Sequence, residues 1–352
     1  MTYLQMSNNT YRAAIADAMH SAMADHPNTI IIGQGVTDFK GLFGTTTGLF
    51  ERYPTRVIET PIAEDSVAGI CIGAALNGLY PINTHIRADF GLLIFNQLIN
   101  LAAKYRYMFG GLFEVPMLVR FVIGRSWGQG AQHSQSLQSL LGHIPGLRVV
   151  MPSSPSAISA CYKEAIQTHR GPVVSFEHRL MYELTFDNEP DSSPGLTGSR
   201  IIRQGSDITI VATSVMVLEA KRAAQYLSNY GISVEVVDLH SISHPDQSLI
   251  IESVSKTRHL LVVDTSWQSY GVAAEISRFI CEYDPSLLAC ASGSLGMKPA
   301  PCPTAKSLED LYYPDIHDIV KSVLAQVNQT MSIPLPEKQA MTDYYKHFKG
   351  PF

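Results

Sequence analysis

Residues 56–86, RVIETPIAEDSVAGICIGAALNGLYPINTHI, contain a strand, a helix and a second strand in that order. RVIET (56–60) is typical of a short strand, DSVAGICIGAALNGL (65–79) of a helix, and YPINTHI (80–86) of another strand. Two strands joined by a helix run parallel in one sheet. The stretch therefore indicates an α/β fold.

The same alternation continues on both sides of this unit. Residues 9–25 have apolar positions at helical spacing, and TIIIGQG (29–35) is typical of a buried strand. Further segments follow in the order helix 90–108, strand 115–124, strand 147–152, helix 154–168 and strand 171–178. We predict a doubly wound, predominantly parallel sheet in a first domain that spans residues 1–185.

A second α/β domain is expected after a linker. Residues 179–206 have no regular spacing of apolar residues and are rich in Pro, Gly, Ser and Asp. We therefore place the linker at 186–204 and the second domain at 205–330. The last stretch, 331–352, has several aromatic residues and two prolines without a period. We expect either a disordered tail or an arm that wraps a neighbour.

Composition limits the classes of function. The 352 residues are enough for two domains, 45% of them are hydrophobic and 16% charged, and the net charge is −5. No basic run suits nucleic acid, and the longest apolar run, 67–82, is interrupted by Asn, Gly and Pro. We expect a cytoplasmic protein that binds neither nucleic acid nor a membrane.

The cysteines and the known short motifs give no metal or phosphate site. Cys71, Cys161, Cys281, Cys290 and Cys302 lack C-x-x-C or metal-ligand spacing, so buried reduced thiols are expected. The chain contains no G-x-x-x-x-G-K-[ST], no G-x-G-x-x-G after a strand and no H-E-x-x-H. No metal site and no phosphate cradle are predicted, so another molecule must supply them.

Two acids, Glu64 and Asp65, open the helix of the first unit. Acids in a first helical turn interact favourably with the helix dipole, and this purely structural role is the more common one. Glu64, however, has apolar neighbours, and a desolvated carboxyl is suited to share a proton with a ligand nitrogen. Asp65 is the better candidate for the structural role.

A second candidate site is the loop 124–136, GRSWGQGAQHSQS. It is rich in glycine and follows a strand, and in α/β sheets such loops lie at the edge where ligands bind. His133 is an acid/base candidate there, although a single histidine is more often structural. We expect Ser134 to be the N-cap of the next helix.

Several segments together resemble a known family. ETPIAE, GAALNGLYPI, FNQLINLAAKYRYMFGG, GAQHSQSLQSLLGHIPGLRVVMPSSP and GPVVSFEH resemble the beta subunit of the first component of thiamine-diphosphate-dependent 2-oxo acid dehydrogenases, of the pyruvate, branched-chain and acetoin type. The resemblance extends from about residue 8 to 328. It implies a transketolase-like pyrimidine-binding domain followed by a transketolase C-terminal-like domain.

The resemblance also implies roles for single residues. Glu64 matches the glutamate that pairs with a ring nitrogen of the cofactor's aminopyrimidine and thereby activates it, and Phe90 matches an aromatic packed on that ring. Ile62 is implied to contact the cofactor. His133 matches a histidine that faces the reacting substrate, with Arg120 and Gln132 on the substrate side.

The implied cofactor is thiamine diphosphate with Mg²⁺, whose diphosphate and metal are held by a separate alpha subunit. The implied assembly is an α₂β₂ heterotetramer in which beta subunits self-associate, with a lipoyl acyltransferase as a further partner. The main hypothesis is decarboxylation of a small 2-oxo acid such as pyruvate. The alternatives are a transketolase-like or carboligating transferase, which moves a two-carbon or acyl unit to an aldehyde, ketone or sugar, and a non-catalytic scaffold.

Departures from the family pattern leave these alternatives open. The substrate-side segment VRFVIGRSWGQG (119–130) differs, His178, Arg179 and His240 occupy unusual positions, and the tail is extra. The segment IQTHRGPV (166–173) is one residue longer than the family's cation-binding loop, so no monovalent cation is predicted. Such variants resemble stand-alone thiamine enzymes of sugar and secondary metabolism.

Overall fold

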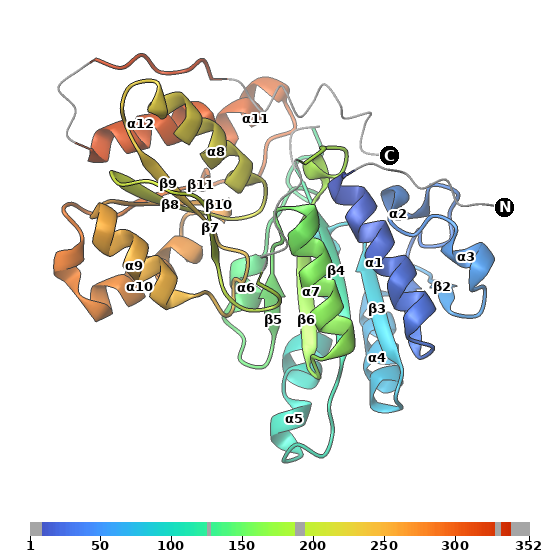
Figure 1. The fold of residues 1–352 in the computed structure, drawn as a ribbon. Coiled ribbons are helices and arrows are strands. Elements are labelled where there is room, and N and C mark those ends of the chain that lie inside the picture. Colours follow the sequence, from blue (N-terminus) through green and yellow to red (C-terminus); the bar gives the residue numbers. More distant parts are fainter. Residues whose placement is uncertain (1–8, 125–127, 187–193, 328–331, 339–352) are drawn as a thin grey trace.

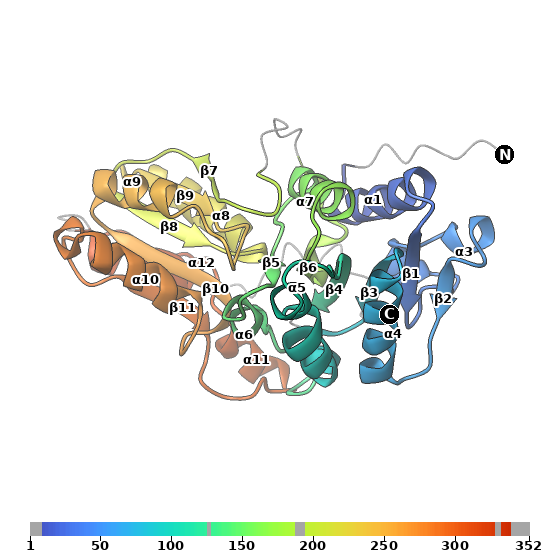
Figure 2. The same cartoon turned by 90° about the horizontal axis from the view of Figure 1, so that it is seen from below.

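The computed structural model describes residues 9–124, 128–186, 194–327 and 332–338, which form two α/β domains side by side (Figure 1 and Figure 2). The predicted α/β architecture with two doubly wound domains is confirmed. Each domain has one central sheet covered on both faces by helices.

The sheet of the first domain is entirely parallel and has the strand order β2-β1-β3-β4-β6-β5. Its strands are β1 (Thr29–Gly33), β2 (Val57–Glu59), β3 (Tyr80–His85), β4 (Met117–Ile123), β5 (Arg148–Val150) and β6 (Pro172–His178). Nearly every residue of these strands is buried, as expected for a parallel sheet covered on both faces.

Helices pack on both faces of this sheet. They are α1 (Tyr11–Asp25), α2 (Gly41–Gly44), α3 (Leu49–Arg52), α4 (Glu64–Leu76), α5 (Tyr105–Met108), α6 (Gln138–Gly142) and α7 (Pro155–Gln167), with the 3₁₀ turns η1 (Ala88–Ile94) and η3 (Arg179–Met181) and the π-helix η2 (Asn96–Ala102). Helices α1 and α7 lie together on one face, and α4, η1 and η2 on the other.

The second sheet is mixed, with the order β11-β10-β8-β9-β7. Its strands are β7 (Arg200–Arg203), β8 (Ile208–Ala212), β9 (Val234–Asp238), β10 (Leu260–Trp267) and β11 (Gly293–Met297); its helices are α8 (Val215–Ser228), α9 (Gln247–Thr257), α10 (Val272–Tyr283), η4 (Pro285–Leu287), α11 (Lys306–Tyr312) and α12 (Ile316–Gln326). Figure 1 shows α8 and α12 on one face and α9 and α10 on the other.

The structure differs from the sequence-based expectation at three places. Strand β7 lies inside the expected linker 186–204, because it pairs antiparallel to β9 and extends the second sheet. The helix expected over 90–108 is divided into η1, η2 and α5. The described part of the expected tail, 332–338, packs on its own chain, since Tyr226 donates to the Pro334 carbonyl (2.7 Å) and Lys338 pairs with Asp318 (3.0 Å).

The cysteines agree with the expectation only in part. All five are free thiols, of which Cys71, Cys161 and Cys302 are buried and Cys281 and Cys290 are exposed. The exposed pair lies at the outer side of the second domain, in α10 and just before β11, where the chain is in contact with solvent.

The two domains are joined by backbone pairing as well as by side chains. Val150 of β5 forms an isolated antiparallel bridge with Ser241, and the Met151 N–H donates to the His240 carbonyl at 2.9 Å. The hydrophobic clusters of the two domains are continuous across this junction. The carboxyl edge of the first sheet is thereby held in contact with the second domain.

Candidate active site

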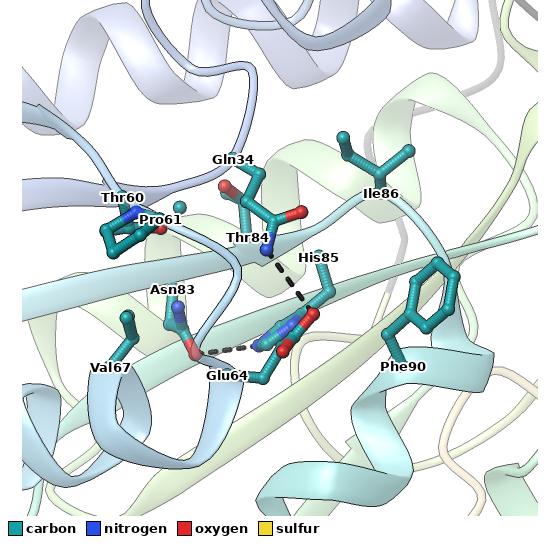
Figure 3. A pocket seen from close by; sticks show the side chains of 11 residues that line it. Gln34, Thr60, Pro61, Glu64, Val67, Asn83, Thr84, His85, Ile86 and Phe90 are labelled. Atoms are coloured by element: carbon teal, nitrogen blue, oxygen red, sulfur yellow. Dashed lines mark hydrogen bonds between the residues drawn. The ribbon is translucent and has the colours of Figure 1, made fainter.

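A pocket opens at the carboxyl edge of the first sheet, between the ends of β1 and β3 and the start of α4 (Figure 3). It is lined by Gly33, Gln34, Thr60, Pro61, Glu64, Val67, Asn83, Thr84, His85, Ile86 and Phe90. In doubly wound sheets ligands bind outside the carboxyl ends of the strands, where the chain leaves the sheet in two directions. The pocket is therefore in the place expected for a ligand site.

Glu64 is the first residue of α4, and its side chain faces this pocket (Figure 3). It is only 7% exposed, and its Oε1 accepts a hydrogen bond from Gln34 Nε2 at 3.3 Å. Asp65, by contrast, is exposed and accepts from Gln97 Nε2 at 3.1 Å on the outside of the helix. The two acids therefore occupy different environments, as their sequence context predicted.

Glu59, in the same short segment, organises the loop that carries Gln34. Its carboxylate accepts from the backbone N–H of Gly35 (2.6 Å) and from both the N–H and the hydroxyl of Thr37 (3.1 Å each). Strands β1 and β3 approach closely at their carboxyl ends, where a Cβ on Gly33 would be 2.3 Å from Thr84 Oγ1. Glu59 was not predicted from the sequence, because no short motif marks a carboxylate that anchors a loop from the next strand.

His85 and Asn83 form a buried polar pair in the lining of the same pocket as Glu64 (Figure 3). Asn83 Nδ2 donates to the Ile32 carbonyl (3.2 Å), so its Oδ1 is left to accept from His85 Nε2 at 2.8 Å. Burial lowers the pKa of His85 to about 4, so the ring is neutral, with the proton on Nε2. The pair was not predicted from the sequence. The available signal was the spacing of Asn83 and His85, since alternate residues of one strand share a face.

Phe90, from η1, lies at the open side of the pocket and is 39% exposed (Figure 3). Its ring makes an edge contact with the ring of His133, with centroids 5.4 Å apart and planes inclined at 86°. Three of the expected site residues are thus brought together, since Glu64 and Phe90 share the pocket and His133 is adjacent to Phe90.

The loop that carries His133 is described from Gly128 onward, and residues 125–127 of the expected segment lie outside the described residues. Gly130 has φ of +69°, and a Cβ there would be 2.6 Å from Thr304 Oγ1 of the second domain. Glycine is required there for both reasons. The prediction that Ser134 is an N-cap is wrong: α6 begins at Gln138 after Leu137, which makes no side-chain cap.

Besides His133, three further expected site residues are not in the pocket lining. Arg120 has no exposed surface, and its Nε and Nη2 donate to Glu177 at 2.6 and 2.9 Å. It lies in a buried polar network with Glu177 and Thr45, whereas the resemblance placed it on the substrate side. Ile62 is 83% exposed, and Gln132 is exposed on the loop before His133.

The residues at unusual family positions are all buried. Arg179 stacks over the rings of Phe43 and Tyr182, at 4.6 and 5.0 Å from their centroids. His240 Nε2 contacts Cys161 Sγ (3.0 Å) and the Gly195 carbonyl (2.5 Å). His178 lines a small cavity between the domains, together with Asp264 and Ser136. Each of them joins parts of the fold that are distant in sequence.

No group of three or more His, Cys, Asp or Glu side chains that could hold a metal ion occurs within the described ranges. Among the same residues no helix combines the length and the apolar character that a bilayer crossing requires.

Comparison with known proteins defines the class. Residues 7–185 match the transketolase pyrimidine-binding domain, and residues 198–319 match the transketolase C-terminal domain. A solved chain described as a split gene transketolase, inactive beta4 tetramer, shares the fold with a TM-score of 0.76 at 20% identity, covering 91% of this chain and 98% of that one. The protein is thus composed of two transketolase-type domains.

Curated relatives narrow the class further. The beta subunit of the pyruvate dehydrogenase E1 component of Rickettsia conorii is 37% identical over 89% of this chain and 97% of its own length. The corresponding mitochondrial subunit of Bos taurus is 37% identical over 91% of this chain and 90% of its own length. The beta subunit of acetoin:2,6-dichlorophenolindophenol oxidoreductase of Cupriavidus necator is 34% identical over 88% of this chain and 94% of its own length. The chain belongs to this family of dehydrogenase beta subunits.

Proposed function

We propose that this chain is the beta subunit of a thiamine-diphosphate-dependent enzyme that decarboxylates a small 2-oxo acid, with pyruvate as the first candidate substrate. The observation that carries the proposal is the carboxylate of Glu64, which is buried at the start of α4 and directed into a pocket at the carboxyl edge of the sheet. A carboxyl group in such a place can exchange a proton with a ring nitrogen.

The pocket residues fit an aminopyrimidine ring. Phe90 offers an aromatic surface at the pocket edge, and Val67 adds an apolar wall. The hydrogen bond from Gln34 fixes the orientation of Glu64, which would hold and move the proton at the ring nitrogen. When bound, the cofactor supplies the nucleophilic carbon that attacks the carbonyl of the 2-oxo acid.

His133 would act at the reacting end of the same site. It lies beyond Phe90, on the loop that is held between the two domains. An imidazole in this position is suited to give a proton to, or take one from, the substrate. Its edge contact with Phe90 links substrate positioning to the residue that packs on the cofactor.

We propose that the diphosphate and Mg²⁺ are held by an alpha subunit in an α₂β₂ heterotetramer. The described residues of this chain include no metal-ligand cluster and no phosphate-binding loop motif. The helix α5 and the loop after it also present Tyr107, Met108 and Leu112 to solvent. Large exposed apolar patches mark sites of protein association, which supports subunit contacts at this end of the first domain.

Reconstitution tests the proposal. The alpha subunit from the same genome, thiamine diphosphate, Mg²⁺ and pyruvate should yield CO₂ with wild-type chain. Glu64→Gln should lower the rate by about 100-fold or more, since it removes the proton-transfer group. Asp65→Asn is the matched control and should remain near wild type. Full activity of Glu64→Gln would refute the catalytic assignment and favour a scaffold subunit.

Two versions of the same assay identify the acyl acceptor. Acetylation of a lipoyl domain supports a dehydrogenase complex with a lipoyl acyltransferase partner. Carbon–carbon bond formation with an aldehyde, without any lipoyl domain, supports the transferase alternative.

A further inference from the structure

Asp89 connects the helical turn that carries Phe90 to the loop that carries His133. It is 8% exposed, and its Oδ1 accepts two hydrogen bonds from Gln135, one from the backbone N–H at 3.1 Å and one from Nε2 at 2.9 Å. Phe90, the next residue, makes the ring contact with His133. Two consecutive residues of η1 therefore meet the loop at two points.

The loop is fixed independently on both sides of His133. Toward its start, Gly130 lies against Thr304 of the second domain. Toward its end, Gln138 Nε2 donates to Asp264 Oδ1 at 2.8 Å, and Ser136 donates to Gln138 Oε1 at 2.7 Å. Between these anchors, the two hydrogen bonds from Gln135 to Asp89 tie the loop to η1.

We propose that Asp89 is the positioning residue of His133: by holding Gln135, it keeps the imidazole against Phe90 and directed to the reacting end of the pocket. The chemical purpose of this arrangement rests on the proposed function, whereas the geometric part does not. Misplacement of a catalytic group by about 1 Å is enough to slow a reaction by roughly 100-fold.

Asp89 acts on the loop through its acceptor oxygen, and its charge is a separate question. Burial raises the pKa of its carboxyl, and the hydrogen bonds from Gln135 and the neighbouring His133 oppose that rise. Arg87 beside η1 and Cys302 from the second domain also interact electrostatically with it. An amide can accept the same two hydrogen bonds without the cost of burying a charge, so the geometric role of Asp89 does not require the acid itself.

Asp89→Ala and Asp89→Asn separate geometry from charge in the reconstituted complex. We expect Asp89→Ala to lower kcat about 10- to 100-fold with little change in the KM for pyruvate. Asp89→Asn, which keeps the acceptor oxygen, should recover most of the loss. Asp65→Ala is the matched control, because Asp65 also accepts from a glutamine side chain but lies outside the pocket.

Two further measurements distinguish positioning from a general structural role. In a His133→Ala background, Asp89→Ala should cost less than about twofold, since it acts through His133; an undiminished loss would overturn the proposal. Gln135→Ala removes the side-chain hydrogen bond and keeps the one from the backbone, so it should give a smaller loss of the same kind as Asp89→Ala, and no loss would overturn the proposal. This variant keeps the test valid where Asp89→Ala folds poorly.

A readout without cofactor or activity completes the test. In the NMR spectrum of the full-length chain, the Phe90 ring should shift the imidazole proton resonances of His133, which are assigned with His133→Ala. Asp89→Ala should move them toward the positions of a solvent-exposed histidine, and Asp89→Asn should not. Unchanged resonances in Asp89→Ala would overturn the positioning role. A complex that fails to decarboxylate would instead count against the proposed function alone.

Discussion

Glu64 and Asp65 are adjacent in sequence and point to different partners: Glu64 accepts a hydrogen bond from Gln34 inside the pocket, and Asp65 accepts one from Gln97 outside it. Successive residues of a helix are about 100° apart around its axis. The register of α4 on the sheet therefore decides which acid meets a ligand. A shift of one residue would place Asp65, with its shorter side chain, at the pocket.

Phe90→Ala should weaken cofactor binding. The substitution removes a ring surface at the pocket edge, and stacking of aromatic pairs contributes about 0.5–1.5 kcal/mol beyond the area that they bury. We expect the dissociation constant for thiamine diphosphate to rise about tenfold in the reconstituted complex, as measured by fluorescence titration. The exposed Phe39, which lies outside the pocket lining, provides the control, and equal effects of both substitutions would contradict the assignment.

Glu59→Gln should loosen the loop that holds Gln34. The carboxylate accepts three hydrogen bonds from Gly35 and Thr37, and an amide keeps at most part of that set. We expect faster hydrogen exchange at residues 35–37 and a cofactor affinity lowered several-fold. Glu51→Gln, on α3, is the control. Unchanged exchange at 35–37 would show that the loop is held by other contacts.

Arg120 and Glu177 should be essential for stability rather than for substrate binding. Removing one partner of a buried ion pair leaves an uncompensated charge and typically costs about 3–5 kcal/mol. Arg120→Met alone should therefore lower the free energy of unfolding in urea, although the hydrogen bonds that Tyr162 and Tyr182 donate to Glu177 offset part of the loss. The double variant with Glu177→Leu should lose less than the sum of the single changes. A KM effect at unchanged stability would restore the substrate-side role.

Acid should destabilise the fold through His85. Its folded-state pKa of about 4 is below the ordinary value of 6.5, so between these values the unfolded chain binds a proton that the folded chain does not. Stability should fall as the pH falls from about 6.5 toward 4, by up to roughly 3 kcal/mol. Urea unfolding at pH 7, 6 and 5 measures it. His85→Phe should flatten this dependence, whereas His143→Gln, at the surface, should not.

The order of strands and helices could be predicted because each element contains its own signal. The buried strand at 29–33 and the helices at 11–25 and 155–167 could be recognised from the local spacing of their apolar residues, which also shows the face that each of them buries. The expected helix over 90–108 was less regular in the structure, since its conformation depends on packing against α4. Strand β7 was missed because it pairs with β9 through residues that are 33 to 38 positions apart, such as Arg203 with Val236 and Arg200 with Asp238.

The candidate site divides in the same way. The sequence named Glu64, Phe90 and His133 as candidates, through the resemblance and through the setting of Glu64 after a strand, and the structure brings the three close together. Arg120 was assigned to the substrate side from its motif, yet the structure places it in the core with Glu177, fifty-seven residues away. The role of Glu59 and the pairing of His85 with Asn83 also depend on how strands are aligned.

Two α/β domains, the helix that opens with Glu64 and the glycine-rich loop before His133 could be predicted from the sequence, because periodicity and short motifs are local properties. The contacts of Asp89 with Gln135 and of Gln138 with Asp264, and the burial of Arg120, are visible only in the folded chain. These contacts join residues 46, 126 and 57 positions apart. Their geometry arises from the packing of whole elements, and burial then sets their strength by removing the competition of water.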